Sequence, residues 1–273
     1  MTILVTGSRG AVARALIPTL RERGLPVRAA SSAPEADGTV HCDLTDPGTF
    51  AAALDGVTSI FLYAEASHAD AFADEAVKAG GRHVVLLSSS SVLADDPAGN
   101  PLAASHLEAE NALLRSPIPA TLLRPGAFAG NATAWSWAVK SGEPVSLPYP
   151  GAHSDAIHES DVAACAAAVL ADPSLGGRPY TLTGPESLTF AEQLAILGRA
   201  LGREIGVKPV TREEWKAEVS AYVRGPYADA LLDWWQSCDG VPAPLTTAVE
   251  ELTGRPAQTF AAWAGANVAA FTH

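Results

Sequence analysis

A glycine-containing turn near the N-terminus constrains the fold of this chain more than any other feature. Residues 5–13 read Val-Thr-Gly-Ser-Arg-Gly-Ala-Val-Ala, and they join a short apolar run to a segment with helical spacing. Gly7 permits a sharp turn, Gly10 lets the backbone approach a diphosphate, and Ala13 is small enough for the helix to lie close to the strand. The free N–H groups at a helix start favour phosphate. The turn therefore predicts dinucleotide binding, with a purely structural turn as the alternative. The predicted contacts are Gly7, Ser8, Arg9, Gly10, Ala11 and Val12.

Short apolar runs and longer amphipathic segments alternate through the first half of the chain. Strands that are apolar throughout are buried on both faces, so they need helices on both sides of a parallel sheet. The pattern predicts a doubly wound α/β fold of the Rossmann type. The expected strands are residues 3–6, 27–30, 39–42, 59–63, 84–88 and 120–123, and the expected helices between them are residues 11–23, 49–54, 68–79 and 103–114.

The pattern loosens after about residue 124, where prolines interrupt the chain. Helical spacing returns later, separated by glycine and proline turns. We predict a dinucleotide-binding core over residues 1–125 and a smaller, mainly helical substrate-binding region over residues 126–273, packed on the same sheet. The helices expected there are residues 159–171, 190–201, 212–220 and 227–235.

Composition excludes several classes of function. The 273 residues carry a net charge of −12, which argues against a nucleic-acid partner and against an anionic membrane surface. Cys42, Cys165 and Cys238 are too widely spaced for a zinc site, and we expect no metal. The N-terminus lacks the basic region of a signal peptide, and no apolar stretch approaches the ~20 residues of a membrane helix. A reduced, cytoplasmic location is the expectation.

The end of the second expected strand indicates which dinucleotide is bound. An NAD site would place an acid about 20 residues after the turn, to hold the ribose 2′-hydroxyl. Here the strand runs into Ser31 and Ser32, and no acid follows until Glu35. An acid would repel a 2′-phosphate, so its absence favours NADP, with Arg9, Arg28 and the two serine hydroxyls as phosphate partners. Alternatively, the two arginines lie on a solvated edge.

Other strand ends supply further candidate contacts to the cofactor. Asp43 closes the third strand and can accept a bond from the adenine amino group or cap the following turn. Ligands of open α/β sheets bind at the carboxyl ends of the strands. The further predicted contacts at these ends are Leu44, Leu62, Tyr63 and Ser88.

Several motifs together resemble the NmrA-like branch of the atypical short-chain dehydrogenase/reductases, with bacterial NADPH:quinone oxidoreductase-like members nearest in pattern. The motifs lie at residues 6–10, 87–91, 106–110, 123–131, 157–163, 182–186 and 251–263. The resemblance implies that Ser90 or a neighbour takes the position of the family's active-site Ser or Thr. It also implies that the segment from Pro125 to Phe128 meets the carboxamide end of the nicotinamide.

The sequence departs from the wider superfamily at the catalytic pair. Active dehydrogenases there use Tyr-x-x-x-Lys, but no tyrosine of this chain has a lysine four residues later. In the expected helix, Leu102 stands in the place of the tyrosine and His106 in that of the lysine. His106 is therefore a candidate to contact the nicotinamide ribose or to protonate the product. The alternative is a structural histidine bonded to Glu110, one turn later.

Aromatic residues after the last expected strand of the core suggest a pocket for a planar substrate. Phe128, Asn131 and Trp135 are the predicted substrate contacts. Trp135 and Trp137 are two residues apart and cannot share one helical face, so at least one is expected to be exposed.

These observations predict an oxidoreductase that passes hydride from NADPH to a quinone or related conjugated aromatic molecule, because such chemistry needs little acid–base help. The alternatives are a non-catalytic NADP(H)-binding redox sensor and a tailoring reductase of secondary metabolism with one specific substrate. A homodimer is a candidate assembly.

Overall fold

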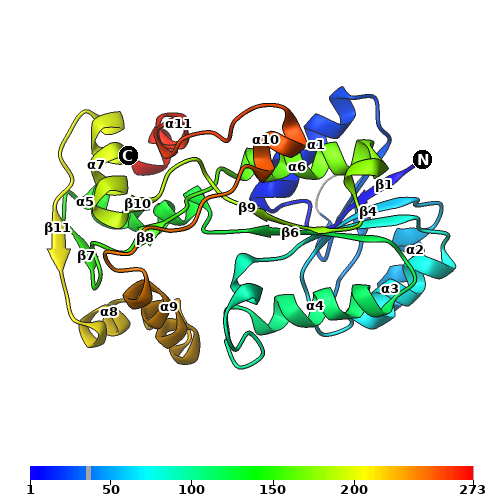
Figure 1. Ribbon diagram of the computed structural model, residues 1–273, viewed down its shortest axis with the longest axis horizontal. Helices are drawn as coiled ribbons and strands as arrows, with labels where there is room; N and C mark the ends of the chain where they lie inside the picture. Colours follow the sequence, from blue (N-terminus) through cyan, green and yellow to red (C-terminus); the bar gives the residue numbers. More distant parts are fainter. Residues whose placement is uncertain (35–37, 273) are drawn as a thin grey trace.

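A computed structural model describes residues 1–34 and 38–272, so Glu35 lies outside the described residues. The described chain contains a seven-stranded parallel sheet in the order β3-β2-β1-β4-β5-β6-β9, with helices on both faces (Figure 1). This confirms the predicted Rossmann-type α/β fold. The strands are β1 (Ile3–Val5), β2 (Val27–Ser31), β3 (Val40–His41), β4 (Ser59–Tyr63), β5 (His83–Leu87), β6 (Ala120–Pro125) and β9 (Pro179–Leu182).

Two apolar layers hold this sheet between its helices. Alternate side chains of a strand point to opposite faces, so Ile3 and Val5 enter one layer and Leu4 enters the other. The first layer lies under α1 (Ala11–Glu22), α6 (Glu159–Ala171) and α10 (Ala248–Thr253). The second lies under α2 (Phe50–Leu54), α3 (Ala69–Lys78) and α4 (Ala104–Arg115).

The seventh strand, β9, was not among the predicted strands. It lies at the edge of the sheet, beside β6, and begins with Pro179. A proline cannot donate to a sheet ladder, so it is tolerated at such an edge. The second half of the chain thus returns to the sheet with β9 and α6, and the division at residue 125 stays a prediction.

The rest of the second half forms a smaller region beyond the carboxyl ends of the sheet strands (Figure 1). Its core packs Phe260, Trp263 and Phe271 against Leu194 and Leu197. It includes two small sheets, β7 (Val145–Leu147) with β11 (Val207–Pro209) and β8 (His153–Ser154) with β10 (Leu188–Thr189). Its helices are α5 (Ser136–Ser141), α7 (Phe190–Leu201), α8 (Arg212–Val219), α9 (Gly225–Ser237) and α11 (Phe260–Ala266).

A buried carboxylate attaches the C-terminal segment to α6. Asp161 is fully buried and accepts hydrogen bonds from the backbone N–H of Gln258 at 2.7 Å and from its side-chain amide at 3.1 Å. Arg255 completes the contact with an Nη1–Oδ1 distance of 2.8 Å. Residues far apart in the sequence are thereby joined beside the sheet.

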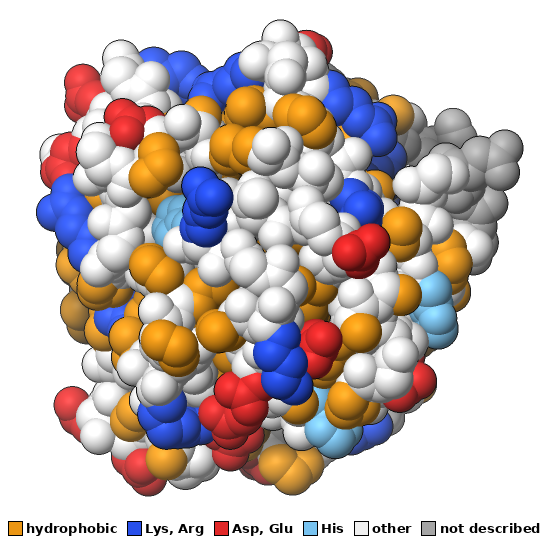
Figure 2. Space-filling view, turned by 90° about the vertical axis from the view of Figure 1, so that its right-hand side faces the viewer, with side chains coloured by type: hydrophobic (Ala, Val, Ile, Leu, Met, Phe, Trp, Pro, Cys, Tyr) orange, Lys and Arg blue, Asp and Glu red, His pale blue; other side chains and the backbone are white. Residues whose placement is uncertain are grey.

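Charged side chains of both signs are scattered over the end of the molecule that carries the amino ends of the strands (Figure 2). Apolar atoms lie between them on that face. Among the described residues, no helix is both long enough and apolar enough to cross a membrane.

The contact of Asp161 predicts a large stability difference between two aspartates. Replacing Asp161 with alanine removes the acceptor of the Gln258 N–H. We expect the free energy of unfolding, measured in urea, to fall by about 2–4 kcal/mol. Asp70→Ala is the control, because Asp70 and its partner Arg115 are 68% and 62% exposed. An exposed pair contributes about 0–1 kcal/mol. Equal losses in the two variants would contradict the anchoring role of Asp161.

Candidate functional site

The glycine turn lies where β1 and β4 part at the carboxyl edge of the sheet. Thr6 is buried, and its hydroxyl donates to the carbonyl of Phe61 at 3.2 Å and accepts from the N–H of Tyr63 at 3.0 Å. Gly7 then adopts φ +58°, a left-handed conformation that favours glycine. The N–H of Ser8 donates to the carbonyl of Ala30 in β2 at 2.9 Å. The turn is thus fixed to the strands on both sides of β1.

The start of α1 offers backbone N–H groups that the cap residue does not use. Gly10 is the N-cap, has an extended backbone and makes no side-chain cap. The side chain of Tyr63 covers this position: a methyl group added at Gly7 would lie 2.7 Å from Cδ2 of Tyr63, and one added at Gly10 would meet its hydroxyl. Burial raises the pKa of Tyr63, whereas hydrogen bonds from the backbone of Ala13 and Val12 act to lower it.

A hollow of about 490 Å³ opens beside this turn. Six predicted site residues line it: Gly10, Ala11, Val12, Tyr63, Phe128 and Asn131. Sequence reasoning missed the other lining residues, which are Leu87, Gly130, Thr133, Glu159, Trp263 and Asn267. Trp263 and Asn267 come from α11 and the residue that ends it, and no local sequence signal connects them with the turn.

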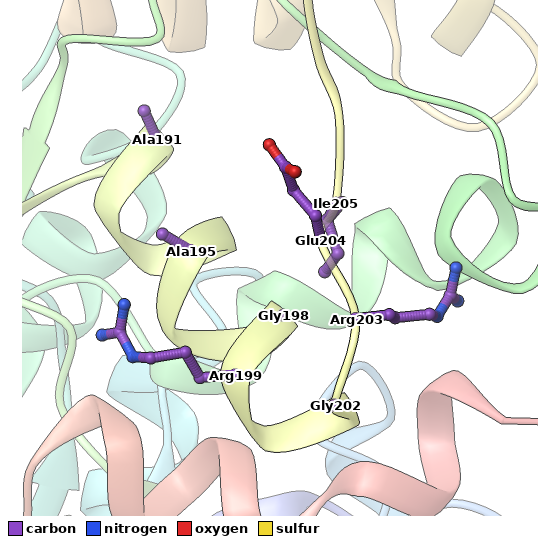
Figure 3. Close-up of a pocket in the computed structure, with 8 residues that line it drawn as sticks. All are labelled: Ala191, Ala195, Gly198, Arg199, Gly202, Arg203, Glu204 and Ile205. Carbon is purple, nitrogen blue, oxygen red and sulfur yellow. The ribbon is translucent and has the colours of Figure 1, made fainter.

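A second hollow, of about 470 Å³, lies between α7 and the segment that follows it (Figure 3). Ala191 and Ala195 of α7 are among the residues that line it. Arg203 donates there to the carbonyl of Val139. None of the residues that line this hollow was a predicted site residue.

The predicted contacts at the ends of β2 and β3 are engaged with their own turns. Ser31 is buried and bonds to the backbone of Ala33. Asp43 accepts from the N–H and hydroxyl of Thr45 at 2.9 and 2.7 Å, and these bonds lower the pKa of its carboxyl. Asp43 therefore caps its turn, one of the two expected roles.

Four other residues near the strand ends, each a candidate cofactor contact, are placed differently from one another. Arg28 donates to the carbonyls of Ala53 and Asp55 at 2.9 and 2.6 Å, so its guanidinium binds the C-terminal end of α2. Leu62 is buried and Leu44 half-buried in the layer under α2, α3 and α4. At the end of β6, Pro125 is buried.

A buried ion pair joins α4 to the end of β5 and to β6. Glu110 is 2% exposed and accepts from Nε and Nη2 of Arg124 at 2.9 and 2.6 Å. Ser88 donates to the same carboxylate at 2.6 Å. Sequence reasoning missed the role of Arg124, although a charged residue near the end of an apolar strand is an available signal.

His106 does not make the hydrogen bond to Glu110 that a structural role for this histidine predicted. The carboxylate of Glu110 is bonded to Ser88 and Arg124, and Nδ1 of His106 is buried with no hydrogen-bond partner among the described residues. Burial lowers the pKa of His106, against the opposing charge of Glu110, so the imidazole is largely neutral at pH 7. Ser90 begins a short 3₁₀ turn before α4 and is half-buried.

Two carboxylates hold the loop that follows β6. Asp155 accepts from the N–H of Ala127 at 3.0 Å, and Glu159 accepts from the N–H of Gly130 at 2.9 Å. A methyl group added at Gly126 or at Gly130 would meet these same carboxylates. Burial raises the pKa of Asp155, although the bond from Ala127 opposes the shift. These two carboxylates therefore fix the loop that carries Phe128 and Asn131.

Trp135 lies in an aromatic row rather than on the hollow. Its ring is edge-on to Phe190 at 6.2 Å between centroids, and Phe190 meets Trp235 at 5.5 Å. Trp137 is 74% exposed, which confirms that one of the two tryptophans faces solvent.

The residues of the turn and of α4 fit a nicotinamide dinucleotide. The glycines leave room above uncapped N–H groups, which favour a diphosphate. The unpartnered Nδ1 of His106 lies on the helix that follows β5, where a ribose hydroxyl would satisfy it. The side chain of Tyr63 is the group that stands over the room left by the glycines.

Known proteins are similar to this chain in sequence. A family described as NAD(P)H-binding matches residues 7–173. A (4-alkanoyl-5-oxo-2,5-dihydrofuran-3-yl)methyl phosphate reductase of Streptomyces griseus is 34% identical, with 98% of this chain and 99% of the relative covered. An NAD(P)H azoreductase of Xenophilus azovorans is 30% identical, over 98% of this chain and 99% of the relative.

Solved structures show the same fold along nearly the whole chain. The NADPH-dependent quinone oxidoreductase QOR2 of Escherichia coli, complexed with NADPH, superposes with a TM-score of 0.81 at 24% identity, covering 97% of this chain and 99% of QOR2. The triphenylmethane reductase of Citrobacter, complexed with NADP(H), gives 0.81 at 21% identity, covering 98% and 100%. Together with the sequence match, these findings confirm the resemblance to NmrA-like proteins. The chain belongs to the NAD(P)H-binding family and is an NAD(P)H-dependent oxidoreductase.

Proposed function

We propose that this protein reduces an electron-poor conjugated small molecule, a quinone or a related aromatic acceptor, with NADPH as the reductant. The observation that carries the proposal is the pair of residues at the positions of the superfamily's tyrosine and lysine, Leu102 just before α4 and His106 within it. Leu102 has no proton to give, and the neighbouring His106 is neutral at pH 7. Reduction of an isolated ketone needs a proton donor at the carbonyl oxygen. A conjugated acceptor spreads the negative charge over several atoms, so solvent can supply its proton later.

The chain's own residues then bind and orient the two reactants. The bound cofactor supplies a hydride. The turn at Gly7 to Val12 holds the diphosphate, and Nδ1 of His106 bonds the nicotinamide ribose. The Glu110–Arg124 pair fixes α4, and with it His106, against the sheet. Phe128 and Asn131 line the hollow and contact the acceptor, while Trp135 supports their loop from the aromatic row.

The relatives support this class of acceptor. The names of two of them, an azoreductase and a reductase of an oxo-dihydrofuran, denote conjugated substrates. Quinone and triphenylmethane reductases share the fold. The tailoring reductase of secondary metabolism remains the narrower alternative within this same chemistry. The cytoplasmic location, the homodimer and the role of Ser90 stay predictions.

The proposal predicts a selective pattern of NADPH oxidation. We expect a benzoquinone, a naphthoquinone, an azo dye and a 2-butenolide to include at least one acceptor that is reduced about tenfold or more above the uncatalysed rate. Cyclohexanone, an unconjugated ketone, should give no turnover. Absorbance at the nicotinamide band measures both rates. Reduction of the ketone alone would contradict the proposal, and tight NADPH binding without any turnover would favour the redox sensor.

His106→Leu tests the contact with the ribose. Because the nicotinamide ribose is common to both cofactors, the variant should bind NADPH and NADH equally less tightly, by about three- to tenfold for one lost hydrogen bond. Cofactor fluorescence gives both dissociation constants. A different result would make His106 the proton donor. In that case cofactor binding is unchanged in the variant, the wild-type rate rises as the pH falls below 6.5, and the rate of the variant does not depend on pH.

Arg9 tests the preference for NADPH. Arg28 is engaged with α2, and Arg9 is exposed in the turn that follows β1, so we propose Arg9 as the partner of the 2′-phosphate. Arg9→Ala should weaken NADPH binding about tenfold, the cost of one charge-assisted bond, and leave NADH binding nearly unchanged. Arg14→Ala, at another exposed arginine further along α1, is the matched control. Equal weakening of both cofactors would contradict the assignment.

A further inference from the structure

The room that the glycines leave at the start of α1 is filled by a side chain of the protein itself. A methyl group added at Gly7 would lie 2.7 Å from Cδ2 of Tyr63, and one added at Gly10 would meet the phenol oxygen. That oxygen lies close to the backbone N–H groups of Val12 and Ala13, which act to lower the pKa of the phenol. A diphosphate at a helix start accepts from these same kinds of groups, so the phenol and the diphosphate compete for one position.

From this overlap we propose that Tyr63 sets the affinity for the dinucleotide, because its hydroxyl occupies the diphosphate position and has to leave when the cofactor binds. The inference rests on cofactor binding by this site, and not on any acceptor or turnover.

The backbone of Tyr63 is fixed, so the movement falls to its side chain. The residue pairs with Leu87 in the sheet, and its N–H donates to the hydroxyl of Thr6. Rotation about the Cα–Cβ bond carries the ring away from the turn without breaking either contact. The hollow beside the turn, lined by Leu87 and Phe128 among others, is the space next to the ring.

The competition favours the cofactor without making the tyrosine irrelevant. The raised pKa keeps Tyr63 a neutral phenol at pH 7, and a neutral acceptor gains only modestly from a hydrogen bond in water. A charged diphosphate gains roughly twice as much per bond. Tyr63 therefore lowers the apparent affinity by the fraction of molecules in which it covers the turn.

Two variants separate the hydroxyl from the ring. Tyr63→Phe removes the hydroxyl above Gly10 but keeps the ring, and Tyr63→Ala removes both. We expect NADPH to associate faster and bind about threefold more tightly to the first and about tenfold more tightly to the second. Stopped-flow cofactor fluorescence without any acceptor gives these values. Tyr227→Ala, at a 45% exposed tyrosine of α9, is the control for loss of an aromatic residue.

Inorganic pyrophosphate provides a second readout on the same position. It should compete with NADPH more strongly in Tyr63→Phe than in the wild type, because it needs the same N–H groups. Unchanged or weaker NADPH binding in Tyr63→Phe would overturn the proposal and make Tyr63 a supporting wall of the site. Thermal unfolding of each variant shows whether Tyr63→Ala folds, and Tyr63→Phe decides the question if it does not. A protein that fails to reduce acceptors would leave both binding readouts intact.

Discussion

The order of the strands around β1 is the constraint on which the rest of the site depends. The chain runs outward from β1 to β2 and β3, then returns to place β4 on the other side of β1. Connections on the two sides leave the sheet in opposite directions, and a crevice opens at the carboxyl ends of β1 and β4. Thr6 bridges those two ends with its hydroxyl. The glycine turn, Tyr63 and the start of α1 meet at this crevice.

The buried pair of Glu110 and Arg124 shows how this chain organises α4 in the absence of the superfamily's tyrosine and lysine. A carboxylate that is 2% exposed has to be compensated, and here three hydrogen bonds from Arg124 and Ser88 do so. Their geometry leaves the neighbouring imidazole without a charged partner at bonding distance. Under the proposed function, α4 orients bound groups and does not donate a proton.

Local sequence signals predicted what depends on local structure. Residues 159–171 and 190–201 form helices with the expected bounds. The first is apolar and buried along most of its length, and the second is amphipathic and begins with a capping box at Thr189. The glycine turn was also predictable, because its conformation at Gly7 needs glycine. What escaped prediction depends on tertiary register. The structural alternative for His106 paired it with Glu110 along their helix, and Glu110 pairs instead across to β6.

Tyr63 illustrates the same limit at the centre of the site. Its position at the end of an apolar strand predicted contact with the cofactor, but the direction of its side chain follows from the gap between β1 and β4 and from the absence of side chains at Gly7 and Gly10. Room made by a glycine is open to any group near enough to fill it, and burial of an aromatic ring there stabilises the protein when the cofactor is absent. A phenol suits that position better than a phenylalanine ring, because its oxygen also lies close to backbone N–H groups at the start of α1. The feature that admits a diphosphate therefore also admits its competitor, and the balance between them follows from the difference between a neutral and a charged acceptor.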